Sequence, residues 1–135
     1  MIKTIEHIGV AVKNIENSVH IFRDLLEIPF DRMYESDAIK TKIAFFPLGE
    51  STIELIEPMD PSSPAAKFIE KRGEGIHHIC LGVENVAAAL RHYEAKGIEL
   101  LNKEPRKTAD GRIIAFLHPK STNGVLIELE EIHAK

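Results

Sequence analysis

The first half of this chain reappears, in altered form, in its second half. The segment Ile5–Val12 matches Ile76–Val83, which places His7 on His78 at an offset of 71 residues. A chain of 135 residues that repeats in this way is expected to fold as two similar supersecondary units sharing one sheet. The repeat is the feature that most limits the possible folds.

The match extends to the late part of each half. The offset of 71 also relates residues 43–45 to 114–116, and an offset of 74 relates residues 52–55 to 126–129. Each half therefore carries one histidine on an early predicted strand and one glutamate on a late predicted strand. The glutamates are Glu54 and Glu128.

Apolar β-branched runs and turn residues predict a βαβββ unit in the first half. Its helix is predicted over residues 15–26, because Asn14 can cap it and apolar residues follow at helical spacing. The connector that follows this βαβββ unit is rich in Pro and Ser. Within it, Ser63-Pro64 predicts the start of a short helix that ends at Arg72. The predicted strands are residues 5–12, 29–33, 39–46 and 51–57, with a polar turn at 35–38.

The second half predicts the same order of elements. Its first strand begins at Ile76, Asn85 caps a helix that Gly97 closes, and Asn123-Gly124 is a hairpin signal. The remaining predicted strands are residues 98–101, 112–118 and 125–131, with a long polar loop at 102–110 and a loosely held tail at 132–135.

One such unit cannot bury its sheet alone, whereas two related by a pseudo-twofold can. We therefore expect one α+β domain over residues 1–135, in which two tandem βαβββ modules form a curved, open-barrel sheet around a cleft. The expected boundaries are module one at residues 4–58, a connector with a short helix at 59–74, and module two at 75–131.

Composition excludes several classes of function. Hydrophobic residues make up 44% of the chain and charged residues 28%, which is ordinary for a globular protein. The net charge of −4 gives no reason to expect nucleic-acid binding, and no apolar run is long enough for a membrane span. The N-terminus lacks the apolar core of a signal peptide, and the single Cys80 suits a reduced core thiol. These features predict a cytoplasmic protein.

The repeated histidines and glutamates suggest a metal site. Two imidazoles and two carboxylates form an N2O2 donor set suited to Zn, Co, Ni, Mn or Fe. Equivalent positions converge near the axis of a pseudo-twofold, so His7, Glu54, His78 and Glu128 are expected to meet in the cleft as metal ligands. The alternative is that each is an ordinary strand residue, with the histidines in the core and the glutamates half-exposed to solvent.

The other histidines and glutamates are weaker candidates. His77 neighbours His78 and is expected to point to the opposite face of its strand. His118 lies at a strand end and could face the cleft mouth. His20 and His92 are predicted on helix surfaces, His133 lies in the tail, and Glu57, Glu130 and Glu131 are predicted at solvated strand ends.

The repeat, with His7 and His78 at the start of the two units and Glu54 and Glu128 near their ends, resembles the vicinal oxygen chelate superfamily and, more closely, its methylmalonyl-CoA epimerase family. The likeness spans residues 4–131 and is most specific in the second half. The segments that carry it are His7–Val12, Ser63-Pro64 with the helix that follows, Gly75–Cys80 and Phe116–Leu129.

The resemblance implies one divalent metal ion per chain, a CoA-thioester substrate and interconversion of (R)- and (S)-methylmalonyl-CoA. Cobalt is the metal that the family often favours, and Zn, Ni and Mn remain open. By position, His7, His78 and Glu128 would be ligands, and Glu54 stands where the family has a Gln or Glu at or near the metal.

The implied reaction removes and returns a proton on the carbon between a thioester and a carboxylate, through an enolate. Glu128 is the candidate for one acid/base. Some family members place the other on the third strand of module one, where this chain has Thr41 or Lys42, so Glu54 becomes the second candidate. Lys42 could instead face solvent or a phosphate of CoA.

Two other functions compete with this one. Glyoxalase I, a lyase acting on a glutathione hemithioacetal, also uses His and Glu from both halves, and Glu54 rather than Gln suits it. A non-catalytic small-molecule binding protein of the bleomycin-resistance type could share the fold. Sheet edges of such modules often join, so a homodimer is also expected.

Overall fold

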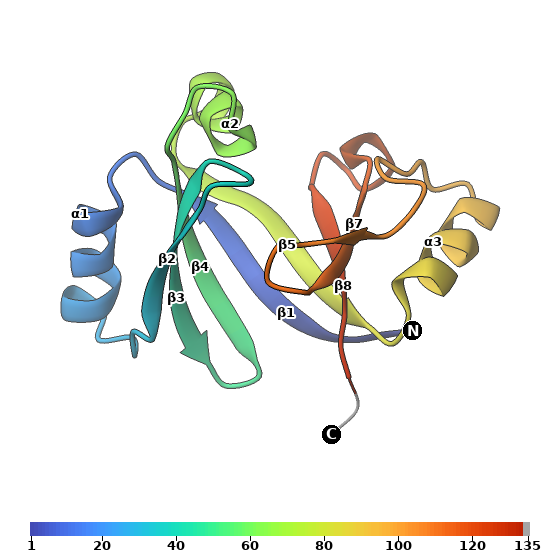
Figure 1. Cartoon of the computed structure of the whole chain (residues 1–135), viewed down its shortest axis with the longest axis horizontal. Helices are drawn as coiled ribbons and strands as arrows, with labels where there is room; N and C mark the ends of the chain where they lie inside the picture. Colours follow the sequence, from blue (N-terminus) through green and yellow to red (C-terminus); the bar gives the residue numbers. More distant parts are fainter. Residues whose placement is uncertain (134–135) are drawn as a thin grey trace. The chain divides into compact units, whose positions relative to one another are not determined.

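The computed structural model describes residues 1–133, and its eight strands form one mixed sheet in the order β2-β3-β4-β1-β5-β8-β7-β6 (Figure 1). The strands are β1 (Ile2–Ala11), β2 (Arg32–Ser36), β3 (Thr41–Leu48), β4 (Ser51–Pro58), β5 (Gly75–Val83), β6 (Arg106–Lys107), β7 (Ile113–Leu117) and β8 (Ile127–Glu131). The helices are α1 (Ile15–Val19), the π-helix η1 (His20–Leu25), α2 (Pro64–Arg72), α3 (Val86–Ala95) and the 3₁₀ helix η2 (Pro119–Ser121).

The two halves repeat the same pairing of strands. In each half the first strand pairs in parallel with the last, as β1 with β4 and β5 with β8. The register is also repeated, because Gly9 lies opposite Glu54 and Cys80 lies opposite Glu128. The predicted α+β fold of two tandem βαβββ modules is therefore confirmed.

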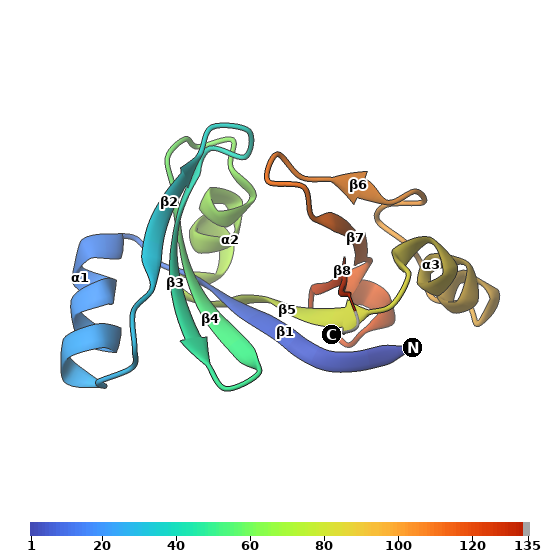
Figure 2. The ribbon, with the colours of Figure 1, turned by 60° about the horizontal axis from the view of Figure 1, so that its bottom comes forward.

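The chain divides into two compact units, residues 7–77 and residues 1–6 with the chain from residue 78 onward. In the first of these units a helix lies on each face of the sheet (Figure 2). Helix α1 packs over one face against a core that includes Phe46 and Leu55, and Phe22 and Phe30 flank the Phe46 ring. Helix α2 packs over part of the opposite face, through Ala65 against Ile43 and Ile56.

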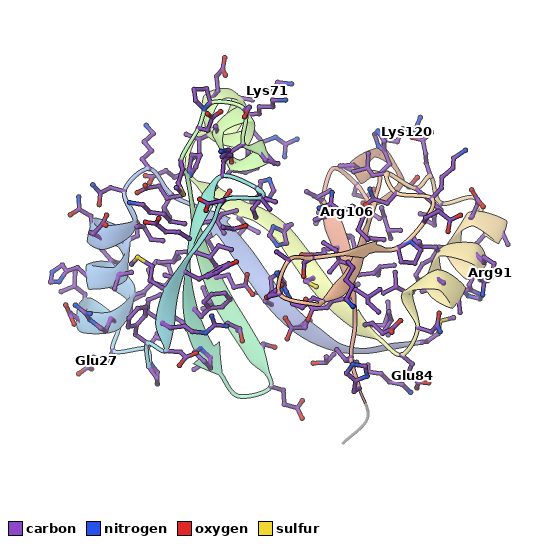
Figure 3. All side chains as sticks on the ribbon, viewed as in Figure 1. Glu27, Lys71, Glu84, Arg91, Arg106 and Lys120 are labelled. Atoms are coloured by element: carbon purple, nitrogen blue, oxygen red, sulfur yellow. The ribbon has the colours of Figure 1, made fainter. Side chains whose placement is uncertain are left out.

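In the other unit α3 covers β7 and β8. Its buried residues Val86, Ala89 and Leu90 pack against Leu117 and Leu129. The opposite side of α3 faces solvent, and Figure 3 shows Arg91 there on the helix surface. This amphipathic pattern leaves the other face of β8, which carries Glu128, outside the helix-packed core.

A strand carboxylate holds the start of one helix in each module. Asn14 and Asn85 cap α1 and α3 as predicted, through side-chain oxygens that accept backbone N–H bonds. In addition, Glu57 accepts the N–H of Ile15 at 2.7 Å, and Glu131 accepts the N–H of Val86 at 3.0 Å. The prediction that these two glutamates are merely solvated was wrong, since each satisfies a helix-end donor that its own helix leaves open.

Three predicted elements differ in the structure. The strand predicted at 29–33 lies at 32–36, because Pro29 has no N–H to give to a ladder and the bond that leads into the strand is donated by Asp31, to the carbonyl of Phe45 at 2.9 Å. The strand predicted at 98–101 is reduced to an isolated bridge between Leu100 and Leu117, and β6 forms instead inside the predicted loop. The helix predicted over 15–26 is α-helical only to Val19 and continues as η1.

The chain end is better held than predicted, up to the last described residues. Ile132 donates its N–H to the carbonyl of Val83 at 2.8 Å, and its side chain lies close to Gly82. His133 is exposed, and the rest of the predicted tail lies outside the described residues. Among residues 1–133 no helix has the length and apolar character needed to cross a membrane.

Candidate metal centre and active site

His7 and Glu54 form a buried pair in the unit of residues 7–77. Nδ1 of His7 lies 3.2 Å from Oε2 of Glu54, and the two residues are only 1% and 6% exposed. The parallel register explains the approach, because Gly9 lies opposite Glu54 and His7 is two residues earlier on the same face of β1.

His78 and Glu128 form the corresponding pair in the other unit. Nε2 of His78 lies 3.2 Å from Oε1 of Glu128, and their exposures are 8% and 4%. Cys80, opposite Glu128, is a fully buried thiol, as predicted. The repeat in sequence is thus also a repeat of side-chain pairs.

Because Glu54 and Glu128 are both buried, the alternative that they are half-exposed strand residues is wrong. A carboxylate loses its hydration on burial and needs a charged or hydrogen-bonding partner in return. Each pair also fits the chemistry of a metal ligand set, because imidazole nitrogen and carboxylate oxygen are both atoms that coordinate divalent metals. Two donor atoms 3.2 Å apart can each lie about 2.1 Å from one ion, with an angle of about 100° between the bonds.

An aromatic ring borders each pair. Phe45 lies opposite Glu54 on β3, and its repeat mate Phe116 lies opposite Glu128 on β7. The Phe116 ring meets the His78 ring edge-on, with centroids 6.3 Å apart. Apolar rings beside a carboxylate lower the local dielectric, and a lower dielectric strengthens electrostatic interactions.

The positions compared with the third-strand glutamate of some family members hold no carboxylate. Thr41 is buried on the face that carries Glu54, where its hydroxyl donates to the carbonyl of Ile39 at 2.9 Å. Lys42 lies on the opposite face, with Nζ 3.9 Å from Glu57. Neither residue therefore supplies a second carboxylate on the Glu54 face.

The remaining histidines have other surroundings. His77 packs edge-on against Phe68, with ring centroids 5.1 Å apart. His118 caps η2 by accepting the N–H of Lys120 through Nδ1. His20 is exposed and bonded to Asp24, whose pKa falls to about 2 chiefly because Arg23 also donates to it. The surface positions predicted for His20 and His92 are confirmed.

Glu130 was predicted to be solvated, and the structure contradicts this. Its side chain is buried, and Oε1 accepts from Nη1 of Arg112 at 3.0 Å. The same guanidinium donates through Nε to both oxygens of Asp110, at 3.2 Å each. Sequence reasoning missed this ion pair because its partners are 18 residues apart and neither belongs to a motif.

Comparison with known proteins agrees with the geometry. Residues 6–116 match the family model described as the Glyoxalase/Bleomycin resistance protein/Dioxygenase superfamily. The chain belongs to this superfamily. Its predicted resemblance to methylmalonyl-CoA epimerases is confirmed by relatives and by solved structures.

Two relatives and one structure illustrate the likeness. The chain is 36% identical to the uncharacterized protein YqjC of Bacillus subtilis, over 94% of this chain and 91% of that protein. It is 35% identical to the ethylmalonyl-CoA/methylmalonyl-CoA epimerase of Cereibacter sphaeroides, over 98% and 100%. A variant of Streptomyces coelicolor methylmalonyl-CoA epimerase in complex with 2-nitronate-propionyl-CoA has a TM-score of 0.90 at 31% identity, covering 99% and 97%.

Proposed function

We propose that this chain is an epimerase that interconverts the (R) and (S) forms of methylmalonyl-CoA. The observation that carries the proposal is the buried His–Glu pair in each module, at the same register and the same 3.2 Å distance. Relatives at 31–35% identity whose names state this activity support it. The name of the Cereibacter sphaeroides relative adds ethylmalonyl-CoA as a second substrate to test.

We further propose that both pairs hold one divalent metal ion, with His7, Glu54, His78 and Glu128 as ligands. The donor set suits Co, Zn, Ni or Mn, and the resemblance favours Co. A bound ion would act as a Lewis acid and stabilise the negative charge that develops on the substrate oxygens when the α-proton leaves.

The proton transfers are assigned to the two carboxylates. Each has two oxygens, so one atom can serve as a ligand while the other exchanges a proton with the α-carbon. Glu128 is proposed to act on one face of that carbon and Glu54 on the other, since inversion requires a group on each side. The absence of a carboxylate at Thr41 and Lys42 supports Glu54 for the second role.

Exchange of the α-proton of methylmalonyl-CoA in D₂O, followed by NMR, tests the proposal. The protein is stripped of metal with a chelator, assayed, and assayed again after addition of Co²⁺, Ni²⁺, Zn²⁺ or Mn²⁺. Deuterium uptake that depends on the metal is expected. No uptake with any of these metals would contradict the proposal, and a glyoxalase assay and then small-molecule binding would follow.

A further inference from the structure

Arg32 lies on the same cross-strand row as Glu54. The register pairs Arg32 of β2 with Phe45 of β3, and Phe45 with Glu54 of β4. Residues directly opposite one another in an antiparallel pair share a face of the sheet. The row therefore leads from the edge strand, which begins at Arg32, to the buried carboxylate.

The guanidinium of Arg32 is fixed in place but open to solvent. Its Cζ atom lies 4.2 Å from the centroid of the Phe45 ring, which is a close cation–π contact. The side chain is nevertheless 56% exposed. Its Nε lies 3.5 Å from a carboxylate oxygen of Asp31, which is itself 55% exposed, and an ion pair of this kind yields readily to a better partner.

Three other cations with aromatic or acidic partners are placed differently. Arg23 has the same chemical surroundings, over Phe30 at 5.9 Å and bonded to Asp24, but it lies on η1, and Phe30 belongs to the core under α1. Arg112 is held by two carboxylates, and Lys42 faces Glu57. Arg32 thus combines a position on the Glu54 face, a fixed guanidinium and access to solvent.

We propose that Arg32 binds an anionic oxygen group of the acyl-CoA ester that reaches Glu54. A guanidinium offers paired N–H donors that match a carboxylate or a phosphate. The inference rests on the proposed function for the class of ligand, and such an ester carries both kinds of anion: the carboxylate of its acyl group and the phosphates of its nucleotide.

Calorimetric titration of the protein as isolated with malonyl-CoA and propionyl-CoA tests the inference. Propionyl-CoA lacks the acyl carboxylate and retains every phosphate. The variants are Arg32→Met, which keeps an apolar stem over Phe45, Arg32→Lys, which keeps the charge, and Arg23→Met as the matched control. Thermal unfolding of each variant confirms that it is folded.

Arg32→Met is expected to raise the Kd of malonyl-CoA about tenfold, as loss of a charge-assisted hydrogen bond predicts, with partial recovery in Arg32→Lys. An unchanged Kd for propionyl-CoA would assign Arg32 to the acyl carboxylate, and an equal rise would assign it to a phosphate. Unchanged affinity for both esters, an equal loss in Arg23→Met, or no binding of either ester by the wild type would overturn the inference. Arg32-dependent binding without α-proton exchange would instead contradict only the proposed reaction.

Discussion

Nε2 of His78 lies 3.2 Å from Oε1 of Glu128, whereas in the equivalent pair Nδ1 of His7 faces Oε2 of Glu54 at the same distance. The two modules thus repeat the residue pair but present different ring nitrogens to the carboxylate. Because a different ring nitrogen faces the carboxylate in each pair, equivalent substitutions in the two modules need not have equal effects on metal binding or activity.

Replacing Glu128 by Gln should abolish metal-dependent exchange of the α-proton. The amide keeps the shape of the side chain but cannot accept the proton, and it is a weaker metal ligand than a carboxylate. The rate falls by a factor of about 10² or more if a general base is lost. NMR in D₂O gives the rate, and metal content per chain gives the ligand effect.

The matched control for that substitution is Glu94→Gln, on the exposed surface of α3. It should exchange the α-proton at the wild-type rate. Full activity in Glu128→Gln would remove Glu128 from the proposed mechanism.

Replacing Glu54 by Gln should separate metal binding from proton transfer. The resemblance places a Gln or Glu at this position, so the variant should keep much of its metal, while inversion loses one of its two acid/base groups. We expect slow formation of the opposite epimer, with metal content near that of the wild type. An unimpaired epimerisation rate would show that another group delivers the second proton.

Loss of either strand carboxylate that caps a helix should destabilise the fold. Glu57→Ala and Glu131→Ala each remove an acceptor for a helix-end N–H and a negative charge favourable to the helix dipole, at a cost of about 1 kcal/mol each. Urea denaturation measures the change. Glu50→Ala, in the exposed turn between β3 and β4, should leave the midpoint unchanged.

Gly82 is expected to tolerate no side chain. A Cβ atom there would lie 2.8 Å from Cγ2 of Thr4 and 3.0 Å from Cγ2 of Ile132. Gly82→Ala should therefore destabilise the protein by about 1–3 kcal/mol. Thr4→Ser removes the nearer methyl group. The double variant should therefore lose less free energy of unfolding than the two single changes predict when added together. If the two losses simply add, the contact with Thr4 is not the cause.

The predicted homodimer is tested by light scattering coupled to size exclusion. Strands β2 and β6 end the order of the sheet, and unpaired strand edges favour association. The expected mass is twice the 15.1 kDa of one chain. A single species at the mass of the monomer would contradict this prediction.

Much of the fold follows from the sequence because its signals are local. The repeat predicted two modules, and Asn14, Asn85 and the Ser63-Pro64 pair predicted where three helices begin; each contact is made within three residues of the cap. The repeat also singled out the histidines and glutamates of the candidate site, although it could not tell a ligand from a half-exposed strand residue.

The tertiary structure decided what depends on residues far apart in the chain. Alternation along a strand shows which residues share a face, but the burial of Glu54 and Glu128 depends on what is packed beside them. Glu57 reaches the N–H of Ile15 across 42 residues, and Glu130 reaches Arg112 across 18. No local propensity encodes such partners, so glutamates that appear solvated in sequence become a helix cap and a buried ion pair once the strands are in register.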